Sequence, residues 1–301
     1  MKIIAISDIY SDIGIVQDLI SIIEESNDEK PIIIIAGDIG IRTKSKHYNR
    51  DVNNIISSLS KICQNVFYVP GDSDNKQLEI TTPNAKNLDR QNYVIDDGEV
   101  KVGLLGLGGA PTHSLRSTEL SPYLWDESLP ITSENIKTDL KINIEKVAQE
   151  RPDYIILVTH SPPYGIADRS KPVTLREILV LEDILEELIE GEVKPEVKGK
   201  ATKRKKPTSI RHLGSHVIRE FVKYYKPDIH IFGHVHKQGG KTETQEATMF
   251  FNVSHLSPLP YKLTGRKFLQ IKITKEKIQA SFDHTVHGKN IPFDEFIETY
   301  L

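Results

Sequence analysis

The chain has 301 residues, of which 38% are hydrophobic and 27% charged, and its formal net charge is −3. This composition is typical of an ordinary soluble globular protein of one or two domains. It excludes an overall basic field that would draw the whole molecule onto nucleic acid. The single cysteine, Cys63, excludes an internal disulfide framework and is expected to be a buried, small apolar residue.

The N-terminal segment carries one lysine and a short apolar run, and polar residues begin at Ser7. This run is too short for a signal peptide. No stretch of about 18 apolar residues occurs, so no membrane-spanning helix is expected. We therefore expect a soluble protein that stays in the cytoplasm and has no membrane partner, which also suits its low cysteine content.

Strands and helices alternate in the first part of the chain. Apolar runs at residues 3–6, 31–36 and 66–69 predict buried strands, and helical periodicity predicts helices over residues 13–25 and 55–62. The strands end in Ser7-Asp8, in Gly37-Asp38 and in Pro70-Gly71-Asp72-Ser73-Asp74. This alternation indicates a layered α/β core, in which sites form outside the carboxyl ends of the strands.

The later part of the chain is richer in strands. Strands are predicted at residues 93–95, 100–107, 154–159, 229–232, 248–253, 267–273 and 278–283. Helices are predicted at residues 133–149, with Ser133 as N-cap, and at residues 215–225. The strand at 154–159 ends in His160, and the strand at 229–232 ends in Gly233-His234-Val235-His236. Two sheets packed together fit this distribution.

One region looks inserted into a single domain that spans residues 1–301. A leucine-rich amphipathic helix is predicted at 174–190, and a polar stretch follows it and ends in Lys203-Arg204-Lys205-Lys206. We expect this part, about 171–210, to combine an inserted helix with a flexible basic loop. The helix could join two copies of the chain or pack on its own domain. The basic run could contact nucleic acid, but such runs are usually just solvated.

Five strand ends carry side chains that can bind a metal ion: Asp8, Asp38, Asp72, His160, and the pair His234 and His236. Taken singly, an aspartate at a strand end often caps the next helix, and a lone histidine is usually structural. Together, converging carboxylates and imidazoles would repel or stay unpaired unless a cation lay among them. Mixed oxygen and nitrogen ligands suit Mn, Fe, Zn, Ni or Co rather than Ca.

These segments resemble the motifs of the calcineurin-like metallophosphoesterase superfamily. In that superfamily Asp-x-His, Gly-Asp, Gly-Asn-His-Asp/Glu, a lone His and Gly-His-x-His each follow a strand. The matching segments here are Asp8-Ile9-Tyr10, Gly37-Asp38, Gly71-Asp72-Ser73-Asp74, Thr159-His160 and Gly233-His234-Val235-His236. The run from Thr159 to Gly165, with Gly214-Ser215 after it, further resembles a phosphodiesterase-like subgroup with the pattern Thr-His-x-Pro-Pro-x-Gly.

The resemblance implies a fold, a reaction and a site. The fold is a four-layer αββα sandwich of two packed mixed sheets flanked by helices. The reaction is hydrolysis of a small phosphomonoester or phosphodiester, and the subgroup resemblance favours the phosphodiester. Carried over by position, a first ion takes Asp8, Asp38 and His236, and a second takes Asp38, Asp72, His160 and His234. Asp38 and a hydroxide bridge the two ions, which together generate the nucleophile. The implied catalytic residues are Asp38, Ser73 and Asp74.

Three positions depart from the superfamily pattern. Tyr10 replaces a histidine; it could bind a hard ion such as Fe(III), or it does not ligate and leaves the first ion weak or completed by water. Asp72 replaces an asparagine, which keeps an oxygen ligand and adds a negative charge. Ser73 replaces the catalytic histidine and cannot protonate a leaving group near neutral pH. Three other histidines are candidates for that step: His113, His212 and His255.

Two other functions compete with phosphoester hydrolysis. A non-catalytic scaffold that kept the fold is favoured by Tyr10 and Ser73, and it is opposed by the many ligands that remain. A nuclease is favoured by the basic run at residues 203–206, and it is opposed by the net charge of −3.

Overall fold

The computed structural model describes residues 1–26, 29–40, 48–75, 78–112, 123–170, 211–254 and 267–284. Two six-stranded sheets form the centre of the molecule. The first contains β1 (Lys2–Ile6), β2 (Ile32–Ala36), β3 (Val66–Val69), β4 (Ala85–Asn87), β15 (Lys267–Ile273) and β16 (Ile278–His284). The second contains β5 (Asn92–Asp96), β6 (Lys101–Leu107), β9 (Tyr154–Thr159), β12 (Ile229–Phe232), β13 (Thr242–Gln245) and β14 (Thr248–Asn252).

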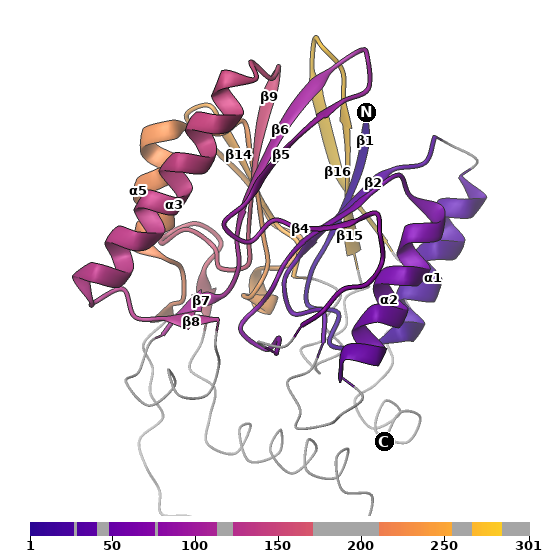
Figure 1. Cartoon of the computed structure of the whole chain (residues 1–301), viewed down its shortest axis with the longest axis horizontal. Coiled ribbons are helices and arrows are strands. Elements are labelled where there is room, and N and C mark those ends of the chain that lie inside the picture. Colours follow the sequence, from indigo (N-terminus) through magenta and orange to yellow (C-terminus); the bar gives the residue numbers. More distant parts are fainter. Residues whose placement is uncertain are drawn as a thin grey trace, which may run out of the picture.

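Helices cover the outer faces of both sheets, as Figure 1 shows. The first sheet carries α1 (Ile13–Glu25) and α2 (Tyr48–Ile62), and the second carries α3 (Pro130–Gln149) and α5 (His216–Tyr225). Short elements complete the described chain: β7 (Ala110–Pro111), β8 (Leu124–Trp125), β10 (Arg169–Ser170), β11 (Arg211–His212) and the 3₁₀ turn η1 (His236–Gln238). The predicted four-layer αββα fold is confirmed.

Strand direction brings the chemically important ends together. In the first sheet β1, β2 and β3 are parallel, and in the second β6, β9, β12 and β14 are parallel. Parallel strands end at the same edge of a sheet, so the residues that follow these strands gather along one edge of each sheet.

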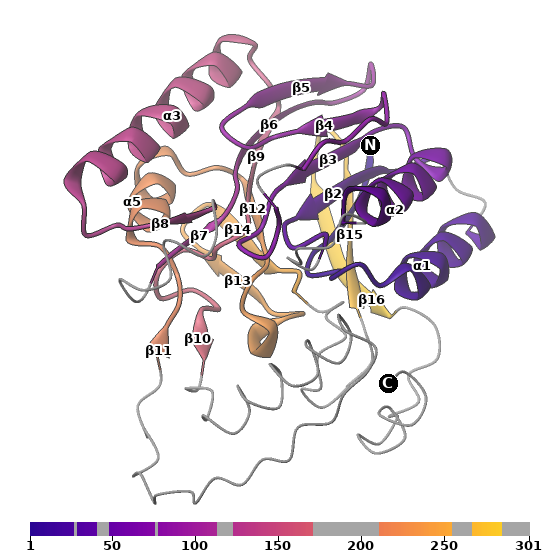
Figure 2. The same cartoon turned by 60° about the horizontal axis from the view of Figure 1, so that its bottom comes forward.

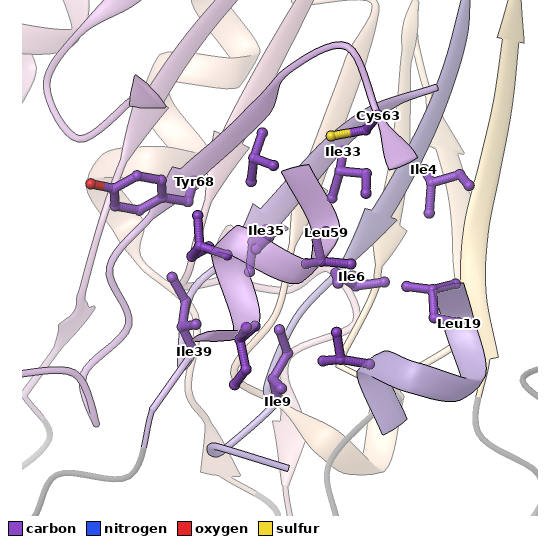
Figure 3. Packing of buried hydrophobic residues seen from close by; sticks show 14 of the residues in the cluster. Ile4, Ile6, Ile9, Leu19, Ile33, Ile35, Ile39, Leu59, Cys63 and Tyr68 are labelled. Carbon is purple, nitrogen blue, oxygen red and sulfur yellow. The ribbon is translucent and has the colours of Figure 1, made fainter. Parts of the chain in front are cut away.

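Isoleucine-rich strands explain why both faces of the first sheet are buried. The five residues of β2 are all buried, as expected for a strand covered on both sides. Side chains of one face, among them Ile33 and Ile35, pack against α1 and α2 (Figure 3). Side chains of the other face, among them Ile34, pack against the second sheet. Cys63 is buried in the helix-covered cluster, as predicted, and burial raises the pKa of its thiol to about 12.

Two helix starts differ from the predictions. Helix α3 begins at Pro130 rather than at residue 133, because proline suits the first helical position; Leu129 is its N-cap, and the prediction for Ser133 was wrong. Ser133 instead donates from its hydroxyl to the carbonyl of Glu127 at 2.9 Å. Helix α2 begins at Tyr48 rather than at residue 55, since Tyr48 and Val52 extend its buried stripe through a polar stretch.

Within the described part of the chain, no helix has the length and apolar character needed to cross a bilayer. The predicted helix at 174–190 and the basic run at 203–206 lie outside the described residues, as do His113 and His255.

Burial of Ile34 between the two sheets generates a stability prediction. Ile34→Ala removes a fully buried side chain from a strand that is packed on both faces. We expect the free energy of unfolding to fall by about 2–5 kcal/mol, measured by urea denaturation. The matched control is Ile131→Ala, because Ile131 is 72% exposed and should change stability by less than about 0.5 kcal/mol. Equal effects of the two substitutions would contradict this packing.

Candidate metal centre

The structure brings the six predicted ligands together from both sheets. Asp8, Asp38 and Asp72 follow β1, β2 and β3, His160 follows β9, and His234 and His236 follow β12. One potential ligand atom from each of Asp72, His160 and His234 lies within 4.8 Å of the others, and the same holds for Asp8, Asp38 and His160. The sheet packing therefore forms one mixed cluster of carboxylates and imidazoles.

One half of the cluster is centred on Asp72. Its Oδ1 lies 2.9 Å from His160 Nε2 and 3.0 Å from His234 Nδ1. Asp38 Oδ2 lies 3.6 Å from His160 Nε2. These are the four residues that the resemblance assigns to the second ion, and we call them the second ligand set.

The other half is centred on Asp8. Its Oδ1 lies 2.9 Å from His236 Nε2, and the hydroxyl of Tyr10 lies among these side chains. Asp8, Asp38 and His236 are the residues assigned to the first ion, and we call them the first ligand set. Tyr10 thus lies at the site, as its place in the first motif predicts.

A contact between the two sheets fixes the orientation of His160. Its Nδ1 lies 2.8 Å from the carbonyl oxygen of Ala36, at the end of β2. A carbonyl only accepts, so Nδ1 carries a proton and Nε2 is directed at Asp72 and Asp38. A backbone partner of this kind is what orients a metal-binding imidazole in proteins.

The backbone is strained where it presents the ligands. Asp8, Asp38 and His234 adopt left-handed conformations with φ of 59°, 50° and 70°. Such conformations are uncommon for residues other than glycine and cluster at functional sites. Gly71 is required for another reason: a Cβ there would collide with the backbone nitrogen and the carboxylate of Asp38.

The ionisation of the cluster is mixed. Burial, together with the charges of Asp72 and Asp8, raises the pKa of Asp38 to about 7, although the charge of His160 opposes this. Burial also acts to raise the pKa of Asp72, but the charge of His234 and hydrogen bonds from two imidazoles hold it well below the ordinary value. For His160, burial disfavours the proton, yet the charge of Asp38 and the bond to Asp72 raise its pKa well above normal.

These features fit a bound cation in the second ligand set. Without an ion, the chain of contacts from Asp38 through His160 and Asp72 to His234 depends on shared protons to balance its charge. Carboxylate and imidazole are together the ligands of Zn, Mn, Fe and related ions. The chemistry available at the site is therefore that of a Lewis acid held at the edge of two sheets.

Asp74, one of the predicted catalytic residues, anchors the loops that carry the ligands. Its carboxylate accepts bonds from the backbone nitrogens of Gly71 at 2.8 Å, Gly40 at 2.9 Å and Ile39 at 3.3 Å. The hydroxyl of Tyr48 donates to it at 2.6 Å. Its catalytic role stays a prediction, and its contacts are those of a positioning residue.

Ser73 and His212 are two further residues for which the sequence predicts a part in the chemistry. Ser73 is half-buried, and its backbone nitrogen donates to Asp38 Oδ1 at 2.8 Å, next to the ligands. His212 lies on β11, beside β10, as Figure 2 shows. Its Nδ1 is 2.8 Å from the buried carboxylate of Asp168, and its ring contacts that of Tyr164. The catalytic role of Ser73 and the role of His212 in leaving-group chemistry both stay predictions.

The sequence reasoning missed several residues that position the ligands. Ser7 donates to Asp8 Oδ2 at 2.5 Å and to the carbonyl of Ala36 at 2.9 Å. The hydroxyl of Thr159 lies 2.8 Å from Nε2 of the buried His230 and donates to the carbonyl of Ser161. Thr159 and Ser161 are the residues on either side of His160 in the sequence. Their polar character in otherwise apolar strand ends was the available signal.

The chain belongs to the calcineurin-like phosphoesterase family, whose sequence profile matches residues 1–238. The comparison with curated proteins finds no match.

Among solved structures, the chain is similar to TT1561 of Thermus thermophilus, with 14% identity, a TM-score of 0.55, and coverage of 93% of this chain and 97% of that one. The NAD nucleotidase of Haemophilus influenzae is 13% identical with a TM-score of 0.48, and the match covers 94% of this chain and 49% of that one. At 14% identity the similarity to TT1561 shows a shared fold and nothing more. The similarity to the NAD nucleotidase carries no further argument.

The anchoring contacts of Asp74 generate a prediction. Asp74→Asn replaces one of the two acceptor oxygens by an amide donor, so some of the four buried donors lose their partner and the free energy of unfolding should fall by about 1–3 kcal/mol. Tyr48→Phe removes one of these donors and should cost less. Urea denaturation measures both. An unchanged stability with turnover lost would instead make Asp74 a catalytic residue.

The raised pKa of Asp38 generates a second prediction. A ligand carboxylate must lose its proton before it binds an ion, so metal affinity should weaken below about pH 7. One displaced proton corresponds to roughly a tenfold rise in apparent Kd for each pH unit. Isothermal titration with Zn or Mn at several pH values measures this slope. Asp38→Asn is the control and should make the slope shallower without abolishing it, because His160, whose pKa is also raised, still has to lose a proton. An equally steep slope in that variant would assign the whole pH dependence to other groups.

Proposed function

We propose that this protein hydrolyses a small phosphodiester with the help of a metal ion bound at the joined strand ends. One observation carries the proposal: Asp72, His160 and His234 come from both sheets and converge within ligand distance of one another, and Asp38 Oδ2 lies 3.6 Å from the same His160 nitrogen. When bound, such an ion supplies a Lewis acid for the phosphoryl oxygens and activates water near neutral pH. The sequence-based prediction of two ions bridged by Asp38 stays a prediction.

The protein side chains hold the reacting groups in place. The bond from His160 Nδ1 to Ala36 keeps Nε2 directed at the ligand cluster, and the strained backbone at Asp38 fixes its carboxylate there. Asp74 ties together the loops of Asp38 and Asp72 through Ile39, Gly40 and Gly71. This rigidity matters because displacement at phosphorus depends on the alignment of the attacking and leaving groups.

Two arguments favour a diester over a monoester. The run from Thr159 to Gly165 resembles a phosphodiesterase-like subgroup, and its backbone is tied to the start of α5 through Ser215, whose nitrogen donates to Pro162 at 2.8 Å. In addition, Asp72 adds a negative charge where the superfamily has a neutral asparagine. A diester carries one negative charge and a monoester about two, so the extra carboxylate repels a diester less.

The replacement of the catalytic histidine by Ser73 restricts the leaving group. A serine hydroxyl does not protonate a departing alkoxide near neutral pH, and the loss of a general acid costs about 10²–10⁴ in rate. Phosphodiesters with acidic leaving groups are therefore the preferred substrates. We place this activity in the cytoplasm, for which a chain with a single cysteine is suited.

Turnover of chromogenic substrates tests the function. The protein loaded with Mn, Ni, Co or Fe should hydrolyse bis-p-nitrophenyl phosphate faster than p-nitrophenyl phosphate. Asp38→Asn should lower kcat/KM by more than about 100-fold, since even loss of a ligand's hydrogen-bond partner costs 10–100-fold. The control is Asp51→Asn, which changes an exposed carboxylate on α2.

Two outcomes would count against the proposal. An ion bound in the second ligand set with no turnover on either phosphoester would favour the scaffold. Hydrolysis of DNA or RNA in preference to both chromogenic substrates would favour the nuclease.

A further inference from the structure

The hydroxyl of Tyr10 lies in the middle of the first ligand set. It is 2.7 Å from Asp38 Oδ2, 3.1 Å from His236 Nε2 and 3.4 Å from Asp8 Oδ1. The Tyr10 and His236 rings meet edge to face, with centroids 5.6 Å apart. One oxygen atom thus contacts every residue that the family pattern assigns to the first ion.

The length of the side chain explains this position. A phenol places its oxygen further from the backbone than an imidazole places its Nε2, by about the length of one metal–ligand bond, roughly 2 Å. A histidine at this position would place its Nε2 where a ligand atom of the first ion is expected. The hydroxyl of Tyr10 extends further, into the space that a first ion would occupy.

The polar groups of the first ligand set also find hydrogen-bond partners without an ion. The hydroxyl of Tyr10 donates to Asp38 Oδ2. Asp8 Oδ2 accepts from the hydroxyl of Ser7 at 2.5 Å and from the nitrogen of His234 at 3.2 Å, while His236 Nε2 donates to its Oδ1 at 2.9 Å. Buried carboxylates with this many donors are stable without a cation. The first ligand set therefore needs no ion to satisfy its carboxylates.

The second ligand set differs in charge. Asp38 and Asp72 provide two carboxylates and His160 and His234 provide two imidazoles, which is a complete set of four protein ligands. Two negative charges balance one divalent ion. The carboxylate of Asp72, in place of a neutral amide, supplies the charge that lets this set hold an ion by itself.

We propose that this chain binds one metal ion, in the second ligand set, and that the hydroxyl of Tyr10 takes the place of the first ion. This rests on the proposed function in that it concerns the same site, but it is tested by counting ions and needs no turnover. It chooses between the alternatives that the sequence left open for Tyr10: the phenol neither ligates a first ion nor leaves room for a weakly bound one.

The experiment counts bound Mn per chain by mass spectrometry after equilibration and removal of free ion. Wild type should hold one ion, and Tyr10→His, which restores the family's imidazole, should hold two. Tyr10→Phe removes the hydroxyl but supplies no ligand atom where the family has an imidazole, so it should still hold one. Electron paramagnetic resonance should show an isolated Mn(II) ion in wild type and an exchange-coupled pair in Tyr10→His.

Three results would overturn the inference. Wild type could hold two ions, Tyr10→His could hold only one while folded, or the iron-loaded wild type could show a visible charge-transfer band that Tyr10→Phe abolishes. If Tyr10→His fails to fold, as thermal unfolding would show, the wild-type count and spectrum decide alone. An inactive protein with one ion would contradict the proposed function but not this inference. An active protein with two ions would contradict this inference but not the proposed function.

Discussion

The structure depends on one electrostatic constraint: buried carboxylates are forced close together where the parallel strands of two sheets end. Asp8 and Asp38 are almost fully buried there, and Asp72 lies beside them. Ionised groups in such a place are stable only with positive partners or hydrogen-bond donors. The imidazoles, the strained loops and the hydroxyls around the cluster all serve to supply these partners.

The packing of the two sheets against each other therefore also assembles the ligand cluster. The bond from His160 to Ala36 joins the end of β9 to the end of β2, and the nitrogen of His234 donates to Asp8 across the same junction. The apolar side chains between the sheets hold these ends together. An ion that binds ligands from both sheets stabilises this packing in turn, since ion binding is coupled to folding.

Much of this arrangement is predictable from the sequence, because the signals are local. Apolar runs identify the strands, and a polar residue after each run identifies the ligands, so the fold and the six converging side chains follow. Contacts made at a distance do not follow. Asp74 has the same local setting as Asp72, yet four donors from other segments make it an anchor. Nothing in the sequence says that Asp168 holds His212, because β11 follows β10 only after a long intervening segment.

Tyr10 and Asp72 are best understood as a linked pair of departures. A single substitution of histidine by tyrosine would remove a ligand and fill the space for one ion, leaving the neighbouring site with an unchanged amide. The carboxylate of Asp72 adds charge to that neighbouring site, where His160 and His234 both contact it. The proposed single ion, together with one more carboxylate, would leave this edge with less positive charge for an anion. That loss would weigh most on a doubly charged monoester, so the one-ion proposal and the proposed preference for a singly charged substrate rest on the same two residues.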